Sequence, residues 1–152
     1  NARFGDPEAM NILPLLKTDF VDICKHILDG TLDRLHIEFE KKATVCKYIV
    51  PKGYGLPADH PDAASSKAKI TVGGVGAARL YYSSVDQRED GLYLSSSRAI
   101  GMVGIADTLD AARKIAEEGV KAVKGPVAYR EDIGTQALIQ KRIDHMKKIR
   151  ML

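Results

Sequence analysis

Hydrophobic residues recur with a helical period before about residue 40 and with an alternating period after it. Thr18 and Asp19 open a predicted helix that Gly30 ends. Its apolar side chains fall on one face, which we expect to be buried: Phe20, Val21, Cys24, Ile27 and Leu28. A helix of about ten residues is predicted to follow Asp6-Pro7-Glu8, with Asp6 as its cap and Pro14 shortening or kinking it.

The alternating part predicts a mainly antiparallel sheet. Residues 43–50 are rich in β-branched and aromatic side chains and are followed by Pro51 and Gly53, which is typical of a strand. The stretch 86–91 ends in Asp90-Gly91 and is predicted to be a hairpin turn, whereas residues 52–68 are predicted to be one long loop. Four further short strands are predicted, at 69–72, 78–83, 91–95 and 98–105.

Two helices and a short strand complete the pattern. An amphipathic helix begins at Asp107 or Thr108 and ends at Gly125, and a strand follows at 127–129. A final helix is predicted over 136–150. Because helices precede a sheet, we expect an α+β chain of three parts, with bounds at 1–40, 41–134 and 135–152.

The composition of the 152-residue chain is that of an ordinary globular protein, which excludes a disordered or fibrous one. Charged residues interrupt every apolar run well before the length of a membrane span, so no membrane partner is expected. The net charge of +3 is too small to indicate a nucleic-acid partner. Cys24 and Cys46 cannot form a disulfide framework or a four-cysteine zinc site, and we expect them to be reduced core residues of a cytoplasmic protein.

Three other features that suggest chemistry are better explained as structure. Gly73-Gly74-Val75-Gly76 is followed by a predicted strand rather than a helix, so it does not fit a dinucleotide-binding loop. The four histidines lack the spacing of metal ligands. The basic residues of 136–150 accompany an apolar stripe, which favours a docked helix with a solvated charged side over a surface that contacts RNA.

The first residues of the chain are the main candidate for a reactive site. In a strand, Asn1 and Arg3 share one face, and Asp6 follows at a helix start. An amide oxygen suits Mg²⁺, a guanidinium can bind a carboxylate or acyl phosphate with two bonds, and a carboxylate can hold an ammonium group. On spacing alone, a simpler interpretation is favoured, in which Arg3 is a surface charge and Asp6 is only a cap.

A resemblance to a known family favours the reactive site. Residues 1–8 (Asn-Ala-Arg-Phe-Gly-Asp-Pro-Glu) and 13–19 (Leu-Pro-Leu-Leu-Lys-Thr-Asp) are similar to the phosphoribosylamine–glycine ligase family. These ATP-grasp enzymes of purine biosynthesis are also called glycinamide ribonucleotide synthetases. Further similar segments occur in the same order, at 43–46 with 51–55, at 96–100 leading to 106–109, and at 129–134.

The resemblance implies the carboxy-terminal third of a longer enzyme that uses ATP and Mg²⁺ or Mn²⁺. In the family, ATP converts the glycine carboxylate to glycyl phosphate, which the amine of 5-phosphoribosylamine attacks to give glycinamide ribonucleotide, ADP and phosphate. Residues 1–40 would then end an ATP-grasp domain, 41–134 would form a small barrel-like β-rich domain with one crossing helix, and 135–152 a helical tail. Most ATP and metal contacts would belong to a missing amino-terminal portion, so the chain alone is expected to be inactive.

The resemblance also implies roles for single residues. Asn1 would be a metal ligand, and Arg3 would be the catalytic residue that binds the glycine carboxylate and its acyl phosphate. Gly5 and Asp6 would position glycine. We expect Arg98 and Ser97 to bind the sugar phosphate, since related ligases place an arginine of an equivalent strand on a ribonucleotide phosphate. The alternative for Arg98 is a charge at the rim of a strand end.

Three departures from the family pattern accompany the resemblance. Ser96-Ser97 stands in place of two glycines, Gly55-Leu56-Pro57 stands in place of Pro-Gly, and the tail from Thr135 extends past the family's usual end. Two other functions stay open at this point. One is a free-standing binding module whose basic tail contacts nucleic acid, and the other is a sheet domain that serves only oligomer contacts.

Overall fold

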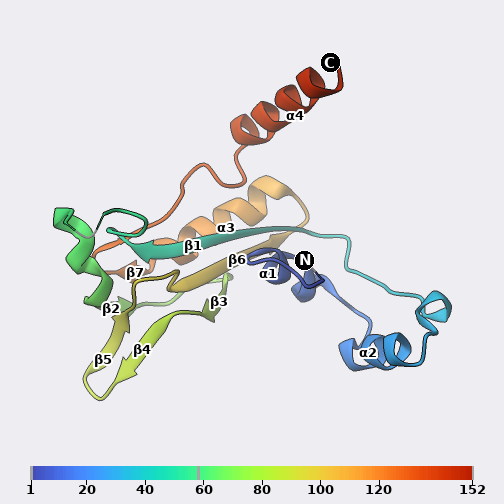
Figure 1. Ribbon diagram of the computed structural model, residues 1–152, viewed down its shortest axis with the longest axis horizontal. Helices are drawn as coiled ribbons and strands as arrows, with labels where there is room; N and C mark the ends of the chain where they lie inside the picture. Colours follow the sequence, from blue (N-terminus) through green and yellow to red (C-terminus); the bar gives the residue numbers. More distant parts are fainter. Residues whose placement is uncertain (1, 58, 152) are drawn as a thin grey trace.

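The computed structural model describes residues 2–57 and 59–151, and its centre is a pair of antiparallel four-stranded sheets (Figure 1). The first sheet has the strand order β3-β6-β1-β8, formed by Arg79–Tyr82, Ile100–Ala106, Ala43–Pro51 and Val127–Ala128. The second has the order β4-β5-β2-β7, formed by Val85–Arg88, Gly91–Leu94, Lys69–Val72 and Val123–Lys124. The predicted mixture of helices with mainly antiparallel strands is confirmed, and the strands are divided between two sheets.

Helix α3 (Leu109–Lys121) packs across β1 and β6 and completes the main core (Figure 1). Thr108 is its N-cap, because the Thr108 side-chain oxygen accepts a hydrogen bond of 3.2 Å from the Ala111 N–H. Ala112 and Ala116 are completely buried, and these small residues let the helix approach the sheet at Gly104. A Cβ atom on Gly104 would lie 1.9 Å from the Ala112 carbonyl oxygen, so this contact requires glycine.

Strand β4 shows that the prediction of a turn over 86–91 is wrong in its extent. β4 pairs with β5 along its whole length, which leaves only Glu89 and Asp90 to connect the two strands. The last three residues of β4 are polar and exposed, so the alternation that marks a half-buried strand is absent from its sequence. The predicted loop 52–68 likewise contains a 3₁₀ helix at Pro61–Lys67.

The amino-terminal segment consists of short helices that lie beside the sheets. Helix α1 (Glu8–Ile12) continues as a 3₁₀ turn (Leu13–Leu15), and a further 3₁₀ turn (Leu32–Arg34) follows α2 (Phe20–Leu28). The Asp19 carboxylate caps α2 by accepting a 2.7 Å hydrogen bond from the Val21 N–H, as the sequence predicts. None of the described residues from 2 to 42 is buried.

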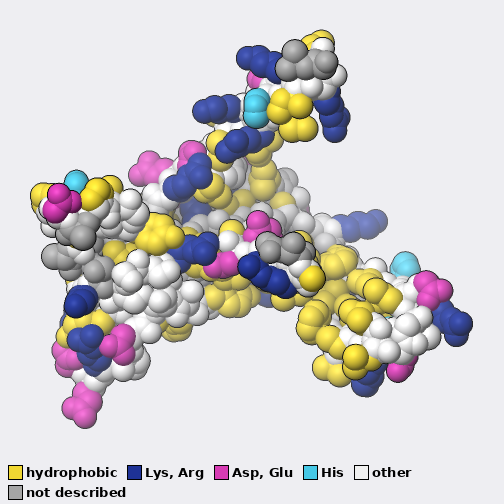
Figure 2. All heavy atoms as spheres, in the orientation of Figure 1, with side chains coloured by type: hydrophobic (Ala, Val, Ile, Leu, Met, Phe, Trp, Pro, Cys, Tyr) yellow, Lys and Arg dark blue, Asp and Glu magenta, His cyan; other side chains and the backbone are white. Residues whose placement is uncertain are grey.

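Two predictions for this segment are wrong. Asp6 does not cap α1, which has no side-chain cap, because the Asp6 carboxylate binds groups of the sheet domain instead. The apolar face of α2 is not buried, since Phe20 is 52% exposed and Leu28 is 86% exposed. Figure 2 shows hydrophobic side chains gathered over α2. Amphipathic spacing indicates that a face needs cover, but it does not indicate which atoms supply the cover.

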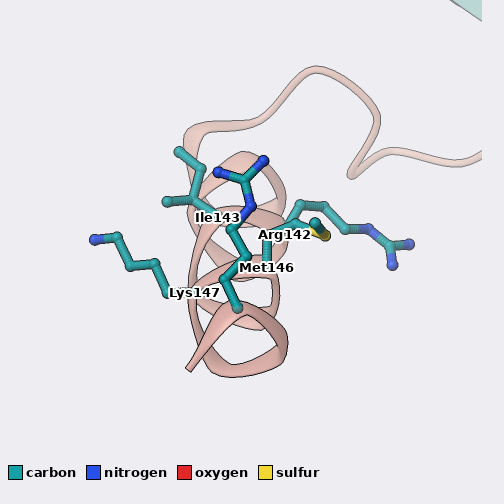
Figure 3. A pocket seen from close by; sticks show the side chains of 5 residues that line it. Arg142, Ile143, Met146 and Lys147 are labelled. Carbon is teal, nitrogen blue, oxygen red and sulfur yellow. The ribbon is translucent and has the colours of Figure 1, made fainter. Parts of the chain in front are cut away.

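Helix α4 (Gln136–Arg150) has the predicted bounds and projects away from the sheets (Figure 1). Its N-cap is Thr135, whose hydroxyl oxygen accepts a 3.3 Å hydrogen bond from the Leu138 N–H. All described residues from 140 to 151 are exposed, including the apolar Ile143 and Met146 (Figure 3). The predicted docking of α4 is therefore wrong for its apolar stripe from residue 140 on, whereas Leu138 and Ile139 in the first turn are half-buried.

Candidate functional site

Asp6 and Arg98 are 92 positions apart in the sequence and meet beside Tyr48 of β1, an inner strand of the first sheet. Arg98 Nη2 lies 3.3 Å from Asp6 Oδ2, and Arg98 Nη1 donates a 3.0 Å hydrogen bond to the Asp6 backbone carbonyl. The Tyr48 hydroxyl donates to Asp6 Oδ1, and the Arg98 guanidinium lies 5.2 Å from the centre of the Tyr48 ring. The structure thus joins the segment before α1, strand β1 and the loop before β6 at one polar cluster.

This cluster borders a hollow of about 480 Å³, a size typical of small-molecule sites. Strand β1, the loop after it, the loop before β6 and the segment around β8 all contribute to its wall. The lining residues are Pro7, Cys46, Tyr48, Val50, Tyr54, Arg98, Ala128, Tyr129, Arg130 and Ile133. Segments that carry the family resemblance, at 43–46, 51–55, 96–100 and 129–134, therefore come together around a single cavity.

Two titratable groups of β1 line the hollow, the Tyr48 hydroxyl and the Cys46 thiol, and both favour their neutral forms. Burial, together with the hydrogen bond to Asp6, raises the pKa of the Tyr48 hydroxyl well above its ordinary range. Burial and the nearby Asp6 charge raise the pKa of the Cys46 thiol to about 12. The thiol form, and not the thiolate, therefore lines the hollow at neutral pH, and Cys46 contributes an apolar surface to its wall.

A buried ion pair supports the opposite wall. The Lys47 side chain is completely buried, and its Nζ lies 2.5 Å from Glu117 Oε2 on α3. Lys47 also donates a 2.9 Å hydrogen bond to the Glu131 backbone carbonyl, and the Tyr129 hydroxyl donates a 2.9 Å bond to Glu117 Oε1. These contacts anchor both sides of Arg130, the wall residue between Tyr129 and Glu131.

The ion pair predicts a pH dependence of stability. Burial works to raise the pKa of Glu117, but hydrogen bonds from Lys47 and Tyr129 outweigh it, so the pKa lies below its ordinary value of 4.5. A lowered folded pKa adds stability above the unfolded pKa, and this stability is lost as the pH falls through the folded pKa. We expect urea unfolding to show that Glu117→Gln costs much less stability at about pH 3.5 than at about pH 7.

The exposed neighbour Glu118 provides the control for this experiment. Glu118→Gln removes the same charge from the same helix but should cost little stability at either pH. An equal cost of Glu117→Gln at both pH values would contradict a stabilising charged pair.

The other predicted site residues do not line the hollow. Arg3 is exposed, and its Nη1 donates a 3.0 Å hydrogen bond to the Phe4 carbonyl. Gly5 is half-buried next to Glu8, where an added Cβ atom would collide with the carboxylate. Ser97 is exposed, and its backbone N–H donates a 3.2 Å bond to Ser95 Oγ. Asn1, the predicted metal ligand, lies outside the described residues.

The acidic, histidine and cysteine side chains of residues 2–57 and 59–151 are dispersed. No group of three or more of them is placed to hold a metal ion, so the donors in these ranges do not form a metal site by themselves. Within the same ranges, no helix combines the length and hydrophobicity needed to cross a membrane.

The family of this chain follows from its similarity to known protein families. Residues 44–136, more than half of the chain, match the family described as phosphoribosylglycinamide synthetase, C domain. The chain belongs to this family. The match confirms the resemblance drawn from the sequence, and it covers both sheets except the first residue of β1 and every lining residue of the hollow except Pro7.

Curated relatives extend the similarity to nearly the whole chain. A phosphoribosylamine–glycine ligase of Methanosarcina acetivorans is 51% identical over 150 residues, which are 99% of this chain and 33% of the relative. The ligase of Methanosarcina barkeri is 53% identical over the same share of both chains. This chain thus spans about a third of the length of these relatives. The tail after residue 136, which the family model does not match, is for the most part included in these alignments.

A solved structure supports the fold. The crystal structure of a phosphoribosylamine–glycine ligase from Thermotoga maritima matches with a TM-score of 0.67 at 24% identity, and the match covers 87% of this chain and 32% of that one.

Three residues of the site, Tyr48, Tyr129 and Arg130, have no role predicted from the sequence. Arg130 lies in the matched segment 129–134, which was the available signal, whereas only the folded chain shows that Tyr48 contacts Asp6.

Proposed function

We propose that this chain is the carboxy-terminal part of an ATP-dependent ligase that joins glycine and 5-phosphoribosylamine. The products would be glycinamide ribonucleotide, ADP and phosphate, in purine biosynthesis. The observation that carries the proposal is the cluster of Asp6, Tyr48 and Arg98 beside a hollow whose walls come from the family's matched segments. Identity of about half over 99% of the chain with named ligases supports it.

The proposed reaction has two steps. A glycine carboxylate oxygen attacks the γ-phosphorus of ATP, which releases ADP and forms glycyl phosphate. The amine of phosphoribosylamine then attacks the acyl carbon, the carbon–oxygen bond to phosphate breaks, and the nitrogen loses a proton. In the first step negative charge moves from the glycine carboxylate to the departing ADP. In the second step it builds up on the carbonyl oxygen of the glycyl group, so a cation placed beside that oxygen lowers the second barrier.

The residues of this chain would bind and orient the reactants. Arg3, which is exposed and donates a hydrogen bond to its neighbour's carbonyl, would contact the glycine carboxylate and its acyl phosphate. Asp6, with Gly5, would hold the glycine ammonium, and its carboxylate is fixed in direction by Tyr48 and Arg98. Ser97 and Arg98 would bind the sugar phosphate.

ATP and Mg²⁺ or Mn²⁺ would be held mainly by the preceding portion of the longer protein. Asn1 would supply one neutral oxygen ligand to the metal ion, which would neutralise charge on the ATP phosphates. The described residues of this chain offer no other complete donor set. For this reason, the 152-residue chain is expected to have no ligase activity by itself.

Reconstitution tests the proposal. The amino-terminal two thirds of the Methanosarcina acetivorans ligase, produced as a separate chain, should restore formation of glycinamide ribonucleotide from ATP, glycine and phosphoribosylamine when mixed with this chain, as measured by mass spectrometry. Arg3→Ala should lower kcat by about 10²–10³-fold, the usual cost of losing a group that stabilises the transition state.

A matched variant and a clear negative result complete this experiment. Arg34→Ala removes another exposed arginine of the amino-terminal segment and should leave kcat unchanged. Turnover by this chain alone would contradict the proposed division of the enzyme. A reconstituted complex that turns over equally fast with Arg3→Ala would contradict the role of Arg3.

A further inference from the structure

We propose that the hollow is the binding site for the phosphorylated five-carbon sugar, and that Arg130, which lines it together with Arg98, is a second phosphate-binding residue. The inference rests on the proposed function, because it assigns a binding site to one of the two substrates of the proposed ligase. It adds to the sequence interpretation a binding residue, Arg130, and a set of aromatic walls, Tyr48, Tyr54 and Tyr129.

The charged groups that line the hollow are hydrogen-bond donors suited to an anion. Arg98 and Arg130 are the charged side chains among the described residues that line it. Each is paired with a carboxylate just outside the lining, Arg98 with Asp6 and Arg130 with Asp132. A phosphate would gain charge-assisted hydrogen bonds from whichever guanidinium N–H groups these pairs leave, and a sugar without phosphate would not.

Both arginines keep donors for such a ligand. A guanidinium carries five N–H groups in a planar fork. Arg130 uses Nε and Nη2 for Asp132, at 3.0 and 2.7 Å, and Arg98 uses Nη1 and Nη2 for Asp6. Within the described part of the chain, these contacts with the aspartates leave the N–H groups of Arg130 Nη1 and Arg98 Nε able to donate hydrogen bonds to a phosphate. The two aspartates meanwhile hold each fork in one direction, which lowers the entropy cost of binding.

The wall that carries Arg130 is rigid. Lys47 holds the Glu131 carbonyl, and Glu117 holds the Tyr129 hydroxyl, so both neighbours of Arg130 are tied to the buried ion pair. Hydrogen bonding from Arg130 lowers the pKa of Asp132, which keeps this orienting carboxylate ionised at neutral pH. A fixed arginine at a hollow of about 480 Å³, with aromatic rings on its walls, suits a compact sugar phosphate.

Direct binding tests the inference without any ligase reaction. Ribose 5-phosphate, a stable probe with the same phosphate and sugar, is titrated calorimetrically into the 152-residue chain and its variants. Arg98→Ala and Arg130→Ala should each weaken binding by about 10–100-fold, because each removes charge-assisted hydrogen bonds. Ribose without phosphate should show no measurable binding to the unmodified chain.

Arg88 provides a matched control. It forms an ion pair with Asp86, also two positions away, but on the β4 edge of the other sheet. Arg88→Ala should leave the affinity for ribose 5-phosphate unchanged. Arg130→Gln, which keeps the length and polarity of the side chain, should weaken binding as Arg130→Ala does, and the melting temperature of each variant reports whether the chain is folded.

Three results would overturn the inference. The first is an unchanged affinity for ribose 5-phosphate in both Arg130 variants. The second is an equal loss of affinity in Arg88→Ala. The third is inorganic sulfate binding as tightly as ribose 5-phosphate, which would show a simple anion site.

The reconstituted ligase separates this inference from the proposed function. There, Arg130→Gln should raise KM for phosphoribosylamine by at least about tenfold while KM for ATP and glycine stays constant.

The two proposals fail in different ways. If the chain binds ribose 5-phosphate through Arg130 but reconstitution yields no product, the ligase function is wrong and the sugar-phosphate site stands. If reconstitution yields product and Arg130→Gln leaves KM for phosphoribosylamine unchanged, the ligase function stands and the site is wrong.

Discussion

Replacing Gly104 by alanine is expected to lower the free energy of unfolding by about 3 kcal/mol or more. The added Cβ atom would lie 1.9 Å from the Ala112 carbonyl oxygen and 2.8 Å from the Ala116 amide nitrogen. Both obstacles are backbone atoms of α3, so no side-chain rotation can relieve the clash. The helix must move away from β1 and β6, which opens the centre of the core. Urea unfolding of the variant measures the loss.

Gly74 provides the control for this substitution. A Cβ atom on Gly74 would meet nothing within 4 Å, so Gly74→Ala should leave stability almost unchanged. Equal stability of Gly104→Ala and the unmodified chain would show that α3 does not lie as close to β6 as the structure places it.

Replacing Lys47 by methionine is expected to have the second large effect, a loss of about 3–5 kcal/mol. Methionine fills a similar volume, but it leaves the Glu117 carboxylate, whose side chain is only 17% exposed, without its buried cation, and the more distant partner Lys121, at 3.7 Å, is 64% exposed. It also leaves the Glu131 carbonyl without its 2.9 Å hydrogen bond. The same change should weaken binding at the hollow, because the wall segment around Arg130 loses its anchor.

Two further variants separate the buried pair from lysine pairs in general. Lys42 forms an equally short ion pair, 2.5 Å from Asp107, but at the surface, so Lys42→Met should change stability little. In the double variant Lys47→Met/Glu117→Leu, no unpaired carboxylate remains, and part of the lost stability should return. If the double variant is less stable than Lys47→Met by the full cost of the second change, the two residues are not coupled.

Local signals in the sequence predicted most elements of the fold. Asp19 and Thr108 do cap helices, and Gly30 does follow one, because caps depend on a few adjacent residues. The bounds of α4 and the central strand β1 were also predictable, since their hydrophobic patterns are long. Strand β4 was not predictable, because it lies at the edge of its sheet and its residues are mostly polar and exposed. Its pairing with β5 is visible only in the folded chain.

The site was predictable only as separate pieces. Asp6 and Arg98 were both expected to bind substrates, but their mutual ion pair joins positions 92 apart, which no local pattern indicates. The same pairing explains the wrong prediction for Asp6, since a carboxylate held by Tyr48 and Arg98 cannot also cap α1. Lys47 carries no signal at all, because a lysine within a strand is ordinarily a surface residue.

The strand order has a consequence for how the domain is made. The last two strands, β7 and β8, pair with the first two, β2 and β1. A growing chain on the ribosome therefore cannot finish the second sheet until Lys124 has emerged, or the first until Ala128 has. Until that moment the earlier strands expose unpaired edges, and this interval is when the nascent protein most needs a chaperone.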